Sequence, residues 1–364
     1  MSRPHIRPAC LLAAAALVAG AAGAVGTAGT AGAATTGAAT TRAGANGAAT
    51  TTTAAGPSAA TPSAVTYTLV TEPSAGYGAI YDLIGSATTS IDLTMYELTD
   101  TTAEHDLAAA AARGVTVRVI LDQNLEKSNN TAAYSYLNAN GVPTHWASTS
   151  YAATHQKTLT VDDATTAIMS GNLTSQYYST SRDFAVIENN SLDVKAIEKV
   201  FEADYAGTAI TPTDGDHLVW SPTDAQSKIL AIINGATTSL SVENEEMGYA
   251  TVVTALENAA KRGVNVEVTM TNDDNEYADE FDALTTAGVH VRTYAYTASL
   301  YIHAKAIVAD YGTSAATVDV GSQNFSSASL NKNRELGFIT TSAPIISGIN
   351  TALASDYAGG TAWS

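Results

Sequence analysis

The chain has 364 residues, of which 35 are acidic and 17 are basic, so its formal net charge is −18. This length and the apolar content allow a soluble protein of two domains or one large domain. A chain this acidic repels polyanions at long range, which disfavours extended nucleic acid as a ligand unless basic groups concentrate locally. An acidic surface is also a common way to keep a secreted protein soluble.

The N-terminal segment has the pattern of an export signal. Residues 1–33 place arginines ahead of a short apolar stretch that small residues follow, which predicts a signal peptide and a secreted, extracellular protein. The single cysteine, Cys10, lies in this segment, so no disulfide is expected in the mature chain. Residues 34–65 are mainly Ala, Thr and Gly and predict a disordered linker. No later stretch is apolar for long enough to predict a transmembrane segment.

The rest of the chain repeats itself at a displacement of about 149 residues. Four pairs of segments match: 85–97 with 235–246, 110–122 with 259–271, 138–146 with 285–293, and 154–163 with 302–311. We therefore expect an α/β protein of two similar halves, 66–210 and 211–364, each a mixed sheet flanked by helices.

Helices and strands alternate within each half. The Ala-rich segments 103–113 and 252–262 predict helices, and the glycines that follow them are placed as C-terminal caps. The apolar runs after these glycines predict buried strands at Val115–Leu121 and Val264–Met270.

The segment 301–310, YIHAKAIVAD, has the apolar pattern of a strand but contains two basic residues. Residues two apart on a strand point to the same face, so His303 and Lys305 would enter one space. An isolated H-x-K pattern is more often structural than catalytic. The repeat weakens that interpretation, because His155 and Lys157 stand at the corresponding position of the first half.

Each copy continues with an aspartate and then with Ser and Asn: Asp162, Ser170 and Asn172, followed by Asp310, Ser322 and Asn324. This pattern resembles the phospholipase D superfamily, whose H-x-K-x4-D and G-S-x-N motifs occur twice in a bilobal chain. The resemblance covers nearly all of residues 66–364, and it implies one active site at a pseudo-twofold interface.

The residue types also suit phosphodiester chemistry on their own. Lysine charges and Ser or Asn donors can neutralise the non-bridging oxygens. One neutral imidazole can attack phosphorus, and a second, protonated one can give its proton to the leaving alcohol. The resemblance implies that His155 is the nucleophile and His303 the general acid, although the sequence does not fix that order.

The resemblance implies a further acidic residue that orients each histidine. Asp183 and Glu335 fit that place, although each could instead pair with the arginine that precedes it. Asp162 and Asp310 are expected to be structural. One departure is Met169, which stands where the motif has glycine.

No cofactor is expected, and no spacing typical of a metal site is present. The acidic run 243–246 could face the active cleft or bind calcium or a cationic head group, because Glu245 and Glu246 align with Tyr96 and Glu97 at a strand end.

Three functions remain open. The first is a secreted phospholipase D that acts on phospholipid at a membrane or micelle surface and transfers the phosphatidyl group to water or to another alcohol. The second is a nuclease of the same superfamily, and the third is a non-catalytic phosphate- or lipid-binding protein. The negative charge favours the lipid substrate. A chain that carries both motifs needs no partner to complete the site, so we expect a monomer.

Overall fold

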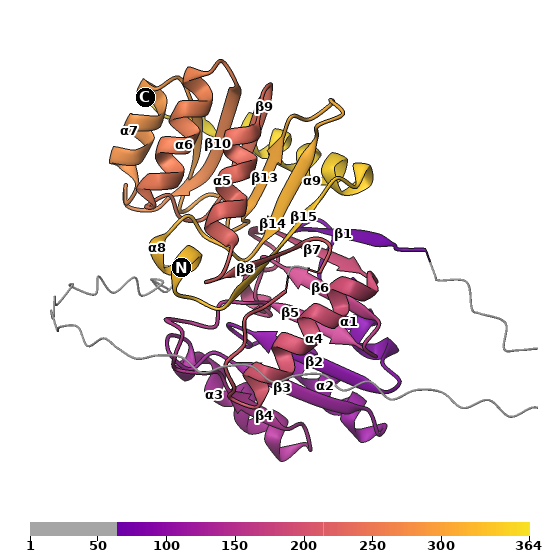
Figure 1. Cartoon of the computed structure of the whole chain (residues 1–364). Helices are drawn as coiled ribbons and strands as arrows, with labels where there is room; N and C mark the ends of the chain where they lie inside the picture. The colour runs from indigo at the N-terminus through magenta and orange to yellow at the C-terminus, as the bar shows by residue number, and fades with distance from the viewer. Residues whose placement is uncertain (1–63, 214) are drawn as a thin grey trace, which may run out of the picture. The chain divides into compact units, whose positions relative to one another are not determined.

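Two eight-stranded mixed sheets organise the molecule, one mainly from each half of the chain (Figure 1). The computed structural model describes residues 64–213 and 215–364, and residues from Ala64 onward form one compact unit. The expected signal peptide, 1–33, and all but the last two residues of the expected linker, 34–65, lie outside the described residues. The predicted fold class of two similar α/β halves is confirmed.

The first sheet has β2, β3 and β4 parallel and its other first-half pairings antiparallel. Its strands lie in the order β1 (Tyr67–Glu72), β7 (Ser181–Glu188), β6 (Thr165–Met169), β5 (Thr158–Val161), β2 (Ser90–Met95), β3 (Thr116–Leu121) and β4 (Thr144–Trp146).

The second sheet repeats this order strand for strand, with one short edge strand added. It runs from β8 (Leu218–Ser221) through β15 (Glu335–Thr340), β14 (Thr317–Gly321), β13 (Ala306–Ala309), β9 (Ser239–Glu243), β10 (Asn265–Asn272) and β11 (His290–Ala295) to β16 (Thr361–Ala362). Equivalent strands therefore carry equivalent parts of the motif.

Helices flank both sheets. In the first half they are α1 (Gly78–Ser86), α2 (Thr101–Ala112), α3 (Lys127–Ala139), the short 3-10 helix η1 (Ser175–Tyr177) and α4 (Ser191–Tyr205). In the second half they are α5 (Ala225–Gly235), α6 (Ala250–Lys261), α7 (Ala278–Thr286), α8 (Ser327–Asn331) and α9 (Ala343–Gly359). None of the helices described between 64 and 364 is long and apolar enough to cross a membrane.

The ends of the two Ala-rich helices follow the expected local chemistry. Gly114 and Gly263 come directly after the last helical turns with φ values of 94° and 91°, a conformation that glycine adopts without a Cβ clash. The chain then enters β3 and β10 directly, which places both strands in equivalent positions next to β2 and β9.

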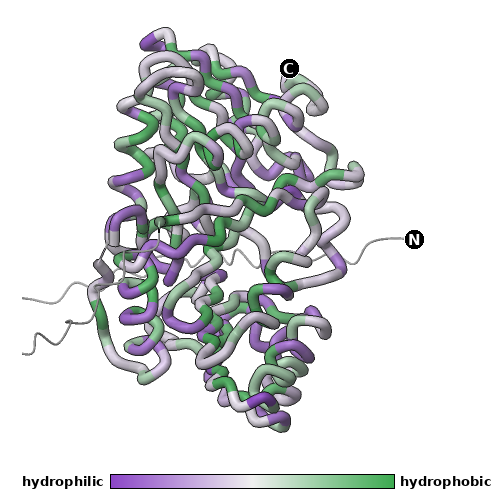
Figure 2. The backbone as a smooth tube through the Cα atoms, turned by 90° about the vertical axis from the view of Figure 1, so that its right-hand side faces the viewer, coloured by the Kyte–Doolittle hydropathy of each residue, from purple (hydrophilic) through white to green (hydrophobic). Residues whose placement is uncertain are grey.

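Three large hydrophobic clusters and one small one stabilise the unit, and hydrophobic stretches run through both halves (Figure 2). One packs α1–α3 against the first sheet, and another packs α5–α7 against the second. The third joins the halves: Phe184 of β7 and Ile168 of β6 pack in one cluster with Val320 of β14 and Phe338 of β15. The two sheets are thus held together by a shared core.

The strand expected over 301–310 is divided between the two sheets. Tyr301–Ile302 forms β12, which pairs parallel with β7 of the first sheet, whereas Ala306–Ala309 forms β13 of the second sheet. His303 and Lys305 lie between them, so they are not strand residues. Ile302 and all of β13 are buried, so the apolar pattern continues from one sheet to the other. It therefore does not reveal that the chain changes sheets.

Candidate active site

Both H-x-K segments lie directly before a strand and are bonded to the opposite half. The backbone N–H of His155 donates to the carbonyl oxygen of Arg334 at 2.9 Å, and that of His303 donates to the carbonyl oxygen of Arg182 at 3.3 Å. The two histidines are therefore positioned by the start of β15 and of β7, respectively, rather than by their own sheets.

The histidine rings are paired in the same crossed way. Nδ1 of His155 lies 2.9 Å from Oε2 of Glu335, and Nδ1 of His303 lies 2.8 Å from Oδ1 of Asp183. A carboxylate on Nδ1 holds the proton at that nitrogen and directs Nε2 away from it, toward a substrate. Each half thus supplies the orienting carboxylate for the other half's histidine.

The charges in these pairs favour ionised carboxylates. Burial raises the pKa of Asp183 and of Glu335, but the facing histidines outweigh burial and hold each pKa below its ordinary value. Burial lowers the pKa of His155, and Lys157 lowers it further. A neutral His155 retains the lone pair that a nucleophile needs.

The two carboxylates are held by different donors. Ser170 Oγ donates to Asp183 at 2.6 Å. Glu335 accepts instead from Ser329 Oγ at 2.6 Å and from Asn333 Nδ2 at 2.9 Å. Sequence reasoning missed Ser329 and Asn333. Only their closeness to Glu335 in the chain could have indicated them.

The arginines next to these carboxylates have other partners. Arg182 pairs with Asp356 on α9, with Nε and Oδ2 2.5 Å apart, and Arg334 pairs with Asp204 on α4, with Nε and Oδ2 2.8 Å apart. Both ion pairs join one half to the other. They hold in place the starts of β7 and β15, which position the histidines. The neighbouring carboxylates, Asp183 and Glu335, remain available to the imidazoles.

The motif lysines turn back onto their own segments. Lys157 Nζ donates to the carbonyl oxygen of His155 at 2.8 Å, and Lys305 Nζ donates to that of His303 at 2.5 Å. Burial, together with the charge of Lys305, lowers the pKa of Lys157 to about 7. The repulsion between the two lysines favours binding of an anion near them.

The four side chains expected to bind phosphate differ in which of their polar atoms already have a hydrogen-bond partner. Oδ1 atoms of Asn172 and Asn324 have no hydrogen-bond partner among the described residues. Both serines are fully buried and engaged: Ser170 donates to the orienting carboxylate, and Ser322 donates to the carbonyl oxygen of Leu336 at 3.3 Å. Phosphate oxygens need a donor, and Nδ2 of Asn324 already donates to two carboxylates, at 3.4 and 3.1 Å. Phosphate binding by all four residues stays a prediction.

Asp162 and Asp310 bind backbone and hydroxyl groups of their own halves. Asp162 accepts from the N–H groups of residues 88, 89 and 90, and Asp310 accepts from those of residues 237, 238 and 239. Burial opposes ionisation, but these hydrogen bonds outweigh it and lower the pKa of both aspartates. The repeated ATTS segments at 87–90 and 236–239 are thus the docking partners of the motif aspartates.

The departure at Met169 is compensated two residues away. In the second half a side chain at Gly321 would meet the Cα atom of Gly337 at 2.4 Å, and the side chain of Gln323 lies over both glycines. In the first half the large residue is Met169, which is 1% exposed, and Gly171 stands at the position equivalent to Gln323. The space at this turn is therefore filled by Met169 in the first half and by Gln323 in the second.

The strand ends after β2 and β9 differ in chemistry. The ring of Tyr96 lies edge-on to His155 with centroids 4.5 Å apart, and Lys157 Nζ lies 5.0 Å from its centroid. The equivalent Glu245 instead forms an ion pair with Lys305, its Oε2 3.0 Å from Nζ. The acidic run 243–246 therefore reaches the site through Glu245, as expected from one interpretation of the sequence.

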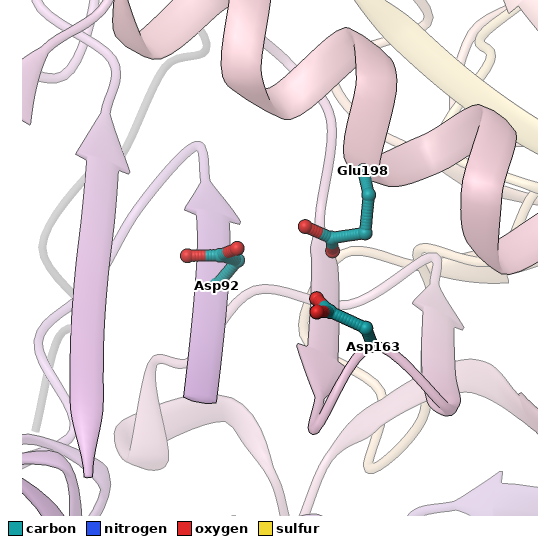
Figure 3. A group of neighbouring side chains, drawn as sticks. All are labelled: Asp92, Asp163 and Glu198. Atoms are coloured by element: carbon teal, nitrogen blue, oxygen red, sulfur yellow. The ribbon is translucent and has the colours of Figure 1, made fainter. Parts of the chain in front are cut away.

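A separate acidic group consists of Asp92, Asp163 and Glu198, each with one carboxylate oxygen within 4.8 Å of the others (Figure 3). Arg118 binds both oxygens of Asp92, at 2.7 and 2.5 Å. Burial and the neighbouring Asp92 raise the pKa of Glu198 to about 9, which keeps it protonated near neutral pH. The guanidinium of Arg118 and the proton on Glu198 thus reduce the repulsion among the three carboxyl groups.

Taken together, the crossed histidines, two lysines and two asparagines form a site suited to phosphodiesters. The chain belongs to the phospholipase D superfamily, whose members act on phosphodiester bonds: the family model described as "Cardiolipin synthase, PLD-like domain" matches residues 80–205 and again 229–357. The two matches coincide with the two halves of the repeat. Comparison with curated proteins found no match.

A synthase and a kinase of solved structure share the fold at low sequence identity. Phosphatidylserine synthase from Haemophilus influenzae Rd KW20 is 11% identical with a TM-score of 0.63, covering 82% of this chain and 87% of the synthase. Polyphosphate kinase from Porphyromonas gingivalis is 15% identical with a TM-score of 0.61, covering 80% of this chain, which spans 50% of the kinase. Nuc from Salmonella typhimurium, a phospholipase D family member, is 22% identical with a TM-score of 0.38 over 41% of this chain and 100% of Nuc.

Proposed function

We propose that this chain is a secreted phosphodiesterase of the phospholipase D type that cleaves the head-group phosphodiester of phospholipids. The observation that carries the proposal is the pair of crossed histidine–carboxylate contacts, at 2.9 and 2.8 Å, beside a lysine from each half. Two oriented imidazoles next to fixed positive charge are what a two-step displacement at phosphorus requires.

In the first step, Nε2 of His155 attacks phosphorus. The bond from phosphorus to the head-group oxygen breaks, and that oxygen takes the proton from Nε2 of His303. The products are the free alcohol, a phosphohistidine at His155 and a neutral His303. Glu335 stabilises the positive charge that develops on His155, because it accepts the hydrogen bond from Nδ1.

In the second step, water attacks the phosphohistidine and gives a proton to His303. The bond between Nε2 and phosphorus breaks, which releases phosphatidic acid and restores both histidines. An alcohol in place of water would give a transferred phosphatidyl group. The negative charge of a bound phosphate raises the pKa of Lys157 again, so Lys157 and Lys305 supply positive charge to the phosphoryl oxygens in both steps.

The choice of lipid over nucleic acid rests on charge. The net charge is −18, and the arginines beside the motifs, Arg182 and Arg334, are held in ion pairs with Asp356 and Asp204. These guanidinium groups are therefore committed to the interface between the halves, which leaves less positive charge for an extended polyanion.

The test is release of choline from phosphatidylcholine in mixed micelles, run beside degradation of single-stranded and duplex DNA, with EDTA present throughout. We expect choline release that disappears in the His155→Ala variant. A matched control is His217→Ala, because His217 also pairs through Nδ1 with a carboxylate, that of Asp193 at 2.8 Å, but lies outside the motifs. DNA degradation without lipid cleavage, lost in the same variant, would assign the chain to the nuclease alternative.

A further inference from the structure

The carboxylate of Glu245 occupies donors of the second half that a substrate phosphate would need. Its Oε2 lies 3.0 Å from Lys305 Nζ, 3.5 Å from His303 Nε2 and 3.4 Å from Asn324 Nδ2. Its Oε1 accepts a hydrogen bond from the hydroxyl of Tyr301 at 3.3 Å. One side chain thus contacts the lysine, the histidine and the asparagine of the second motif.

This arrangement imitates a bound phosphodiester in charge and in contacts. A carboxylate and a phosphodiester each carry one negative charge, and both accept hydrogen bonds from ammonium, imidazole and amide groups. Burial raises the pKa of Glu245, but His303 and Lys305 outweigh it and hold that pKa below its ordinary value. The ionised carboxylate and a substrate phosphate cannot use the same donors at the same time.

The first half has no equivalent anion among its described residues. At the position of Glu245 it has Tyr96, which presents a ring to His155 and Lys157. Substrate can therefore approach the donors of the first half directly, whereas on the second half it must displace a carboxylate.

Displacing Glu245 has an electrostatic cost because its surroundings are already acidic. Burial and the charge of Glu245 raise the pKa of the adjacent Glu246 to about 7. Glu97, at the equivalent position of the first half, also has a pKa raised to about 7, first by burial. A buried carboxylate that loses its cationic partners in such a place is strongly destabilised unless another cation replaces them.

A substrate can bring that cation itself. In a zwitterionic head group an ammonium lies close to the phosphate, on the alcohol that leaves. We propose that Glu245 is a specificity-determining residue that selects zwitterionic phosphodiesters: the phosphate takes Lys305 and Asn324, and the ammonium takes the displaced carboxylate of Glu245. This selectivity rests on the phospholipase function proposed above and goes further by naming the class of head group.

The experiment measures kcat/KM on phosphatidylcholine and on phosphatidylglycerol, each diluted in the same neutral detergent micelle. We expect the wild-type protein to prefer phosphatidylcholine and Glu245→Gln to reduce that preference about tenfold, mainly by faster cleavage of phosphatidylglycerol. The control is Glu257→Gln on α6, which makes the same change in net charge but removes only the i, i+4 ion pair with Lys261.

A binding measurement tests, without turnover, whether the carboxylate of Glu245 competes with phosphate for the same donors. Glu245→Gln should bind inorganic phosphate about tenfold more tightly than the wild-type protein by titration calorimetry, because the competing charge is gone. An unchanged phosphate Kd, or an unchanged lipid preference in a variant that still cleaves both lipids, would overturn the selectivity alone. Absence of cleavage of either lipid by the wild-type protein would overturn the phospholipase proposal as well.

Discussion

The two copies of the motif lie in sheets with the same strand order, yet their histidines have different surroundings. His155 is buried beside the ring of Tyr96 and close to Lys157, and both burial and this lysine lower its pKa. His303 faces a carboxylate on each nitrogen, Asp183 on Nδ1 and Glu245 on Nε2. The first environment suits a neutral nucleophile, and the second, with a carboxylate at each nitrogen, is the one to which the proposed mechanism assigns the general acid. A duplicated motif can thus keep its geometry while the charges around its two copies differ.

The largest expected effect tests this division of roles with a substrate that needs no acid. On a phosphodiester with a p-nitrophenol leaving group, His155→Ala should lose activity by at least about 10⁴-fold, whereas His303→Ala should keep a substantial part of it. Both variants should fail on a choline ester, since choline leaves only when protonated.

The measurement is nitrophenol release by absorbance, with choline release measured in parallel. Residual nitrophenol release by His155→Ala combined with none by His303→Ala would reverse the assignment of nucleophile and acid.

A smaller effect tests the crossed pairs. Asp183→Asn and Glu335→Gln should each lower kcat about 10²-fold with little change in KM, because each acts through a histidine rather than on the substrate. Glu335→Gln should also shift the acid limb of the pH–kcat profile downward, because Glu335 raises the pKa of His155 against the effects of burial and Lys157.

A merely structural role would lower the amount of folded enzyme without moving that limb. The control is Asn333→Ala, which removes one hydrogen bond to Glu335 but leaves the carboxylate in place. It should affect kcat much less than Glu335→Gln, and an equal loss would point to packing rather than charge.

The smallest effect concerns a part of the motif in which the two halves behave alike. Asp162→Asn and Asp310→Asn should each destabilise the protein by about 1–2 kcal/mol at pH 7, since each variant weakens several hydrogen bonds, at a partly exposed site for Asp162 and a buried one for Asp310. The pKa of each aspartate is lowered in the folded state, so its contribution exists above about pH 4 and is lost as the pH falls.

Urea unfolding at pH 7 and at pH 3 measures both effects. The difference between wild-type and variant proteins should shrink at pH 3. A difference that stays constant, or that appears in only one half, would contradict the equivalence of the two aspartates.

Much of the fold could be predicted from the sequence because the repeat is strong. The matched segments indicated two similar halves, and the glycines after the Ala-rich helices indicated where β3 and β10 begin. The switch of sheets at residues 301–310 could not be predicted, because local apolar alternation does not tell which sheet a strand joins.

The site was predictable by residue type but not by pairing. The motif indicated both histidines and both candidate carboxylates, yet two similar halves give no signal that Asp183 faces His303 and Glu335 faces His155. Ser329 and Asn333 have no matched counterpart in the first half, so the repeat could not indicate them. The contact of Glu245 with Lys305 depends on tertiary packing, and the alignment showed only that this position could face the cleft.

The strand β12, which leaves one half to pair with the other, also bears on how the enzyme fails. Tyr301 and Ile302 hold the chain to β7, and the next residue is His303, the histidine of the second motif. Any motion that separates the two sheets therefore pulls on residues 303–305, the short link between β12 on the first sheet and β13 on the second. Because this link carries the second H-x-K pair, we expect activity to be lost on heating when the two sheets separate.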